Sequence, residues 1–155
     1  MAATSSNSGT GALPWRELNH IALATRDLEA TIRFYTDVLG MHADEIEPAN
    51  PIHGRTCIIK LSPNATSHFH LHFFEQADAQ PIQVHPEMSR RLMFPTVGVH
   101  HIAFGLPDAA AAARLQERLE ARGIPTTPVM DQGDVYNLLF NDNNDLSLEA
   151  NWPKE

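Results

Sequence analysis

Histidine is frequent in this chain of 155 residues, which contains nine of them. Two of the nine, His20 and His101, occupy the same position in two similar stretches, NHIALATRD at 19–27 and HHIAFGLPD at 100–108. The neutral imidazole is the commonest side-chain ligand for metals and carries protons near neutral pH. Because the two histidines recur at one position of an internal repeat, we predict that both bind a single divalent metal ion.

Each of the two stretches opens a copy of the same pattern of elements. A strand is followed by a helical pattern that begins near Asp27 in the first copy and near Pro107 in the second, as a capping residue and a first helical residue would. The two patterns end at Gly40 and Gly123, which are typical helix stops. Three strand-like runs follow each helix, at 41–47, 56–61 and 68–75 and then at 124–130, 135–141 and 146–151. The predicted fold class is α+β, with two tandem βαβββ modules that form an open, curved mixed sheet around a metal-binding cleft.

Composition sets the predicted boundaries within this one domain. The stretch rich in Ser, Thr, Gly and Ala at 1–14 is predicted to be a disordered tail, followed by the first module at 15–75. The polar, proline-containing segment at 76–98 is the predicted connector, and 99–152 the second module.

Charge and cysteine content restrict the function and the compartment. The formal net charge of −8 gives no basic surface for nucleic acid or an anionic membrane. The only cysteine, Cys57, lies in an apolar run, where a buried small hydrophobic residue is expected, and a single thiol fits a reducing compartment. With no signal sequence and no apolar run long enough to span a membrane, we predict a cytoplasmic protein.

The alternation of side chains along each strand predicts which of them face the cleft. Ile21 and Leu23 suit the helix side of the first strand, so His20 faces the open side, and the same alternation applies to His101. At the module ends, His72 and Glu149 are expected on the open side. An unpaired charge in a half-buried strand is costly, which favours Glu149 as a ligand.

The repeated openings NHIALATRDLEATIRFYTDVLG and HHIAFGLPD, with a Leu-Glu pair near the end, resemble the vicinal oxygen chelate superfamily of glyoxalase, bleomycin-resistance and extradiol dioxygenase proteins. The resemblance covers about 15–152 and implies four metal ligands, namely His20, His72, His101 and Glu149. The chain departs from the family at the turn before the last strand, which reads Asp-Asn-Asn-Asp (142–145) rather than Asp-Pro-Asp-Gly. It also has His72 where glyoxalases have a glutamate.

The ligand set favours one reaction and leaves others open. Two histidines and a carboxylate form the facial triad of Fe(II) oxygenases, so the favoured function is an Fe(II) extradiol-type dioxygenase acting on a small catechol-like substrate. His70 and Tyr136 are its acid or base candidates. Whether His72 or His70 is the fourth ligand stays open, because a shift of register would exchange their depth in the cleft.

Two alternatives remain. With His72 bound as well, a Ni, Co, Mn or Zn site would suit a glyoxalase- or epimerase-type lyase or isomerase that stabilises an enediolate, and another residue, such as Glu75, would have to act as the base. The second alternative is a metal-free small-molecule binding protein of the drug-resistance type. We expect a homodimer, because an unpaired strand edge requires cover. Arg55, Lys60, Arg90 and Arg91 are candidate partners for an anionic substrate group.

Overall fold

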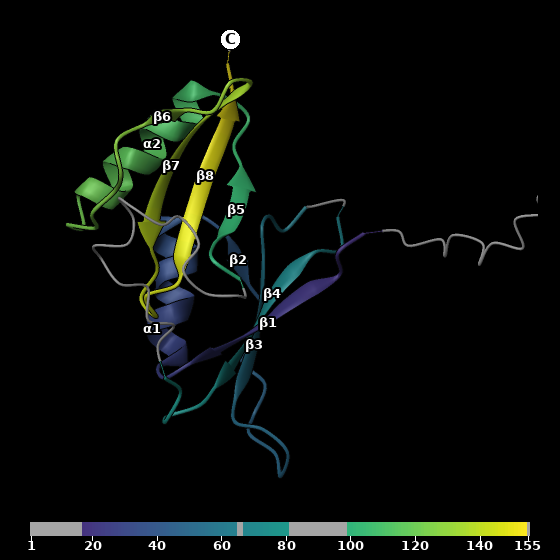
Figure 1. The fold of residues 1–155 in the computed structure, drawn as a ribbon. Helices are drawn as coiled ribbons and strands as arrows, with labels where there is room; N and C mark the ends of the chain where they lie inside the picture. Colours follow the sequence, from purple (N-terminus) through teal and green to yellow (C-terminus); the bar gives the residue numbers. More distant parts are fainter. Residues whose placement is uncertain (1–16, 65–66, 81–98, 155) are drawn as a thin grey trace, which may run out of the picture.

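A computed structural model of the protein describes residues 17–64, 67–80 and 99–154. The predicted tail at 1–14 and most of the predicted connector, 81–98, lie outside the described residues. The predicted fold class is confirmed, since the chain forms two four-stranded mixed sheets, each with its own helix (Figure 1).

The first module contains one sheet with the strand order β1-β4-β3-β2. Its elements are β1 (His20–Thr25), α1 (Leu28–Arg33), the wider helical turn η1 (Phe34–Val38), β2 (His42–Ala43), β3 (Thr56–Lys60) and β4 (His70–Glu75). Strand β1 is parallel to β4, and the other pairs are antiparallel. As a result, β1 is an edge strand.

The second module repeats this arrangement with the order β5-β8-β7-β6. Its elements are β5 (Ile102–Gly105), α2 (Ala109–Glu120), β6 (Met130–Asp131), β7 (Val135–Asn141) and β8 (Ser147–Pro153). Strand β6 is much shorter than the predicted run at 124–130. Pro125 and Pro128 have no N–H to donate to a ladder, so this run pairs only through an isolated bridge from Thr126 and at Met130.

Both helices begin and end at equivalent signals. Asp27 accepts a hydrogen bond from the Ala30 N–H, and Asp108 caps α2 in the same way. The prediction that Pro107 is the first helical residue is therefore wrong, because Pro107 precedes the cap. Gly40 (φ 73°) and Gly123 (φ 65°) follow the helices in the left-handed conformation that glycine adopts without steric cost.

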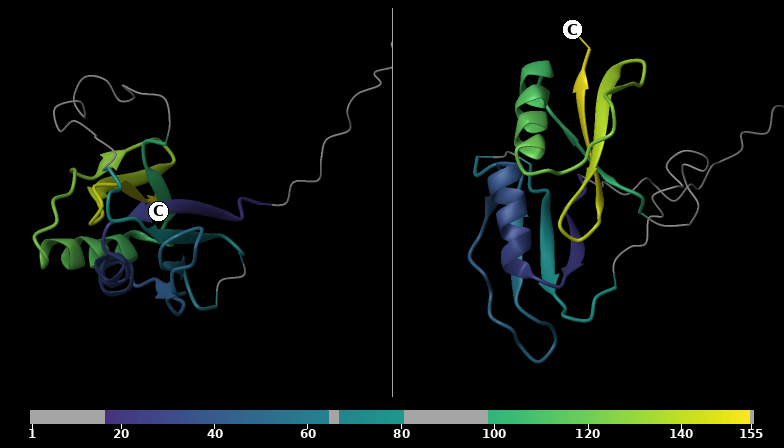
Figure 2. Two further views of the ribbon diagram at one scale, coloured as in Figure 1. Left: turned by 90° about the horizontal axis from the view of Figure 1, so that it is seen from below. Right: turned by 90° about the vertical axis from the view of Figure 1, so that its left-hand side faces the viewer.

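The hydrophobic core lies between the helices and one face of each sheet. Strand β1 runs across the view of Figure 1 while β8 runs nearly vertically, and α2 and α1 follow one another along one side of the molecule in Figure 2. The fully buried side chains come from both modules and include Leu28, Tyr35, Leu71, Leu119 and Leu148. Within the described ranges, no helix is long and apolar enough to cross a membrane.

Candidate metal centre

Three histidines lie together on the open face of the first sheet. His20 on β1 is directly opposite His70 on β4, and Ala22 is opposite His72. The His20 and His70 rings stack, with centroids 5.2 Å apart and an interplanar angle of 15°. The His72 ring lies 6.3 Å from that of His20 and 6.4 Å from that of His70. The alternation of β1 and β4 thus places them as predicted from the sequence.

Hydrogen bonds orient two of these rings. His20 Nδ1 lies 2.8 Å from Asn19 Oδ1, and His70 Nδ1 lies 3.0 Å from the carbonyl oxygen of His68. Because these oxygens only accept, each neutral ring carries its hydrogen on Nδ1, which leaves the Nε2 lone pair available.

The surroundings of the third histidine of the group disfavour its charged form. Burial lowers the pKa of His72, the neighbouring His70 and His20 lower it further, and Glu47 acts in the opposite direction. A neutral imidazole is the form that can bind a metal ion.

The second sheet carries a histidine and a carboxylate. His101 immediately precedes β5, and its Nε2 lies 3.3 Å from Glu149 Oε2 on β8. Only 14 % of the Glu149 side chain is exposed, and Asn151 Nδ2 donates a 3.4 Å hydrogen bond to Glu149 Oε1. Glu149 is therefore a largely buried carboxylate that contacts the polar side chains of His101 and Asn151.

The internal repeat relates the two groups residue by residue. His101 follows His20 by 81 positions, and the same offset takes Ala22 to Ala103. Ala22 lies opposite His72, and Ala103 lies opposite Glu149. The position of His72 in the first module is thus the position of Glu149 in the second.

The two groups belong to different sheets. Within residues 17–64, 67–80 and 99–154, no three His, Cys, Asp or Glu side chains are arranged so that they could hold a metal ion. Each module of the described chain therefore contributes half of the predicted ligand set.

The structure does not bring Tyr136 together with this set. Tyr136 pairs with Trp152 on the buried, helix-facing side of the second sheet, whereas Glu149 pairs with Leu139 on the other side. The Tyr136 ring packs instead against Trp152 and beneath Lys154 Nζ, 5.0 Å from its centroid. Tyr136 therefore lies on the opposite face of the sheet from the predicted ligands.

Glu75 also lies on a helix-facing side. Arg55 donates two hydrogen bonds of 2.7 Å to its carboxylate, and these lower the pKa of Glu75. It pairs in register with the buried Thr25. The suggestion that Glu75 supplies the base is thus wrong, because its carboxylate is occupied on the face away from the histidines.

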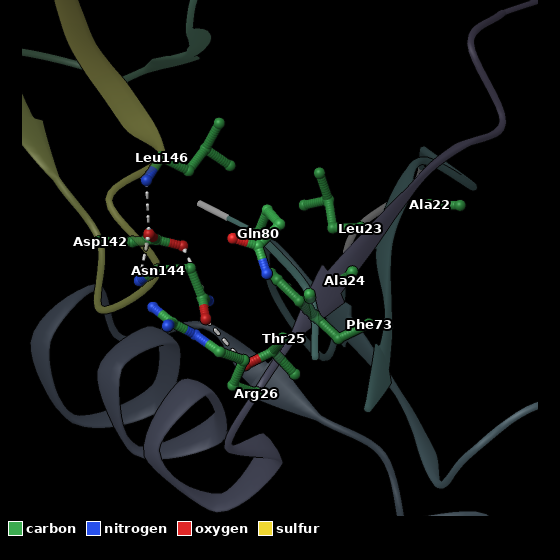
Figure 3. Close-up of a pocket in the computed structure, with 11 residues that line it drawn as sticks. Ala22, Leu23, Ala24, Thr25, Arg26, Phe73, Gln80, Asp142, Asn144 and Leu146 are labelled. Carbon is green, nitrogen blue, oxygen red and sulfur yellow. Dashed lines mark hydrogen bonds between the residues drawn. The ribbon is translucent and has the colours of Figure 1, made fainter. Parts of the chain in front are cut away.

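A pocket opens along β1, the strand that begins with His20, and lies between β1 and the turn that joins β7 to β8 (Figure 3). Its volume is about 250 Å³. The lining residues are Ala22, Leu23, Ala24, Thr25, Arg26, Phe73, Ala79, Gln80, Asp142, Asn144 and Leu146. Ala22 and Ala24 share the face of His20, so small side chains leave the room that the sequence predicts.

The cations available to an anionic ligand differ from those proposed from the sequence. Arg55 is bound to Glu75 and Glu29, Lys60 is bound to Asp44, and Arg90 and Arg91 lie outside the described residues. Arg26 lines the pocket and forms no hydrogen bond or ion pair with the described part of the chain. Arg26 directly follows β1, and this position in the sequence is the signal that could have identified it as a pocket residue.

Asn137 is a second residue that sequence reasoning missed. It is 5 % exposed, its Oδ1 is buried without a hydrogen-bond partner, and it pairs with Asn151 on the Glu149 side of the second sheet. An unsatisfied buried acceptor costs free energy, so this oxygen is suited to a ligand that donates a hydrogen bond. The sequence signal that could have identified Asn137 is an asparagine within the otherwise apolar run VYNLLF.

The unusual turn at 142–145 joins the two modules. Tyr35 Oη donates a 3.0 Å hydrogen bond to Asp142 Oδ2, while Asp142 Oδ1 accepts from the N–H groups of Asn144 and Leu146. Asp145 takes the left-handed conformation with φ 64°. Burial raises the pKa of Asp142. The turn therefore keeps its geometry without glycine or proline.

Comparison with known proteins agrees with this architecture. Residues 17–149 match the Glyoxalase/Bleomycin resistance protein/Dioxygenase superfamily. The chain belongs to this superfamily. A solved glyoxylase/bleomycin resistance protein/dioxygenase domain from Frankia sp. EAN1pec superposes with a TM-score of 0.70 at 20% sequence identity, covering 91% of this chain and 94% of that one.

Two curated relatives are epimerases. The mitochondrial methylmalonyl-CoA epimerase of Dictyostelium discoideum is 32% identical over 113 residues, which cover 72% of this chain and 62% of that protein. The ethylmalonyl-CoA/methylmalonyl-CoA epimerase of Cereibacter sphaeroides is 33% identical over 106 residues, covering 68% of this chain and 70% of that protein. The chain thus spans less than two thirds of the length of the Dictyostelium protein.

Proposed function

We propose that this protein is a divalent-metal-dependent epimerase or lyase that moves a proton at a carbon next to a carbonyl group. Its ligands are His20, His72, His101 and Glu149. The observation that carries the proposal is the equivalence of His72 and Glu149 in the two modules, each beside the strand that begins with a repeated histidine. It favours His72 over His70 as the fourth ligand.

The chemistry of the donor set fits a metal ion. Three neutral imidazoles and one carboxylate are nitrogen and oxygen ligands that suit Zn, Ni, Co or Mn. The His20 ring, whose Nδ1–H is bound to Asn19 Oδ1, has the outer hydrogen bond typical of a ligating histidine. A divalent ion held there would polarise the substrate carbonyl and stabilise the negative charge that develops when the adjacent carbon loses its proton.

His70 is the proposed acid and base. It lies on the same face as His72, and its Nδ1 bond to the His68 carbonyl leaves Nε2 able to accept a proton from carbon. The pocket along β1 would hold the substrate, with Arg26 available to its anionic group. This arrangement suits a negatively charged thioester of the kind named for the two epimerases.

The Fe(II) dioxygenase favoured from the sequence receives less support. That preference rests on the facial triad of two histidines and a carboxylate, and on the missing glutamate at position 72, which leaves an epimerase without the base that glyoxalases have there. His70 offers an alternative base on the required face, and the two curated relatives are named as epimerases. We therefore prefer the isomerase or lyase branch.

We propose further that the complete site forms across a homodimer. The histidine group and the His101–Glu149 pair lie on different sheets of one chain. In a twofold dimer, the first sheet of one chain can face the second sheet of its partner, and symmetry then makes two complete sites.

The first experiment measures metal content and proton exchange together. The metal-free protein is loaded with Zn, Co, Ni, Mn or Fe(II), and exchange of the carbon-bound hydrogen of methylmalonyl-CoA with D₂O is followed by NMR. We expect one ion per chain and deuterium incorporation without oxygen uptake. Oxygen consumption with catechols in the Fe(II) protein, and no exchange with any ion, would reverse our preference.

Matched variants separate the roles. Glu149→Gln should lose the metal, whereas His70→Gln should keep the metal and lose exchange, and His42→Gln on the exposed edge strand should do neither. A dimer of a His20→Ala/His72→Ala chain with a His101→Ala/Glu149→Gln chain should bind one ion if the sites cross the interface. If each site lies within a chain, this mixed dimer will bind none.

A further inference from the structure

A stripe of arginines runs along helix α2 and into the turn after it. Arg114 and Arg118 lie one turn apart on α2, and Arg122 follows at the same spacing just beyond the end of the helix at Glu120. Arg118 donates to the carbonyl of Val38 at 3.3 Å, and Arg122 donates to the carbonyl of Asp37 at 3.1 Å. These two cations therefore satisfy the end of η1, where helix carbonyls carry partial negative charge.

Arg114 differs from the other two members of the stripe. It forms no hydrogen bond or ion pair with residues 17–64, 67–80 or 99–154, although the chain has a net charge of −8. It lies one turn before Arg118 on α2 and lines a pocket. A cation without a protein partner beside a pocket is free to pair with a bound anion.

The pocket is mostly apolar and lies between the modules. Its volume is about 150 Å³, and it is lined by α2, the end of η1 and the second sheet, where it reaches the proposed metal ligand Glu149. The lining residues are Val38, Leu39, Met41, Phe104, Leu106, Ala111, Arg114, Leu115, Arg118, Phe140, Glu149 and Ala150. An apolar cavity of this size in another protein accommodates a benzene molecule.

We propose that this pocket binds a small apolar carboxylate, with its carboxylate on Arg114 and its apolar body against Phe104, Leu115 and Phe140. A guanidinium matches the planar carboxylate with two parallel hydrogen bonds. A single delocalised charge at the edge of an apolar cavity also costs less to desolvate than a doubly charged phosphate. The site is separate from the pocket of Figure 3, which lies along β1.

Benzoate is a suitable probe, with benzyl alcohol as its uncharged counterpart. The full-length protein is titrated with each compound by ¹H–¹⁵N NMR, and a fragment of this size should bind with a dissociation constant on the order of 1 mM. We expect shifts of the amides of Phe104, Leu115 and Phe140. Benzoate should bind about tenfold more tightly than benzyl alcohol, because only benzoate pairs with Arg114.

Variants of the stripe provide the decisive comparison. Arg114→Gln, an exposed helical position, should remove the preference for benzoate while leaving benzyl alcohol binding unchanged. Arg122→Gln removes a cation of the same stripe that does not line the pocket, so it should preserve the preference. Leu115→Trp should fill the cavity and abolish binding of both compounds.

Several results would overturn the proposal. Benzoate shifts confined to β1 and the 142–146 turn would assign the ligand to the other pocket. If Arg114→Gln and Arg122→Gln lose the preference for benzoate equally, the preference arises from the overall charge of the protein and not from a contact with Arg114. If neither compound binds the wild-type protein, the proposed site does not exist. This result does not depend on whether the Leu115→Trp variant folds.

Discussion

The hydrogen bond from Tyr35 in η1 to Asp142 is a buried polar contact between the first module and the hairpin that carries Glu149. Tyr35 is fully buried, Asp142 is 6 % exposed, and Oη and Oδ2 are 3.0 Å apart. Replacing Tyr35 with Phe removes this donor with little change of volume. The loss therefore isolates the hydrogen bond from the packing.

The expected magnitude follows from the charge of the acceptor. A hydrogen bond to a charged group contributes about 1.5–3 kcal/mol, more than a neutral one. Asp142 keeps the two backbone donors at Asn144 and Leu146, so we expect a loss of about 2 kcal/mol. In a chain of this size, that should lower the melting temperature by about 4–8 °C.

The loss should also depend on pH. Because burial raises the pKa of Asp142 in the folded protein, the folded state holds this proton to a higher pH than the unfolded chain does. The free energy of unfolding therefore falls as pH rises from the ordinary aspartate value to the raised one. The Tyr35 hydroxyl lowers this pKa, so Tyr35→Phe should raise it further and extend the fall to higher pH.

Urea denaturation at about pH 5 and about pH 8 measures both effects. The cost of Tyr35→Phe should be greater at the higher pH, where a larger fraction of Asp142 is ionised. Tyr136→Phe is the control, because the Tyr136 hydroxyl forms no hydrogen bond within the described residues and should cost less than about 0.5 kcal/mol. Equal costs for the two substitutions, or a cost independent of pH, would refute the reasoning.

Two further predictions concern steric room at two glycines and the burial of Cys57. An added Cβ at Gly54 would lie 2.2 Å from the carbonyl oxygen of Glu75, so Gly54→Ala should cost about 1–3 kcal/mol or more in thermal denaturation. At Gly133, with φ 94° and nothing within 4 Å, the same change should cost only the backbone strain of about 1–2 kcal/mol; a smaller loss at Gly54 than at Gly133 would contradict this. Cys57 is 1 % exposed, and burial raises its thiol pKa to about 11, so a thiol reagent should label it only as fast as the protein unfolds. Immediate labelling of the folded protein would show that β3 is less protected than the structure indicates.

Much of the architecture could be predicted because its signals are local. The offset of 81 residues identifies two modules, and Asp27 caps its helix through a contact only three residues away. Alternation with a period of two places His20 and His72 on the open faces. Proline shortens the predicted strand at 124–130 for an equally local reason, since it lacks an N–H.

The errors in the candidate site have a different origin. Tyr136 is a candidate by its expected face and its proximity in sequence, although it alternates in phase with the buried Leu138 and Phe140. Glu75 was chosen as a nearby carboxylate, and only the fold reveals that Arg55, twenty residues earlier, is bound to it. Neither choice took account of the partner across the sheet.

The sequence by itself determined the two βαβββ modules and the faces on which the predicted ligands lie, because helix caps, turns and strand alternation depend on residues close together in the chain. Only the tertiary structure gives the register of β4 against β1 and of β8 against β5, which places His72 opposite Ala22 and Glu149 opposite the equivalent Ala103. It also decided that the two halves of the ligand set lie on separate sheets. Register and the placement of sheets depend on pairing and packing between distant segments, for which no short stretch of sequence carries the information.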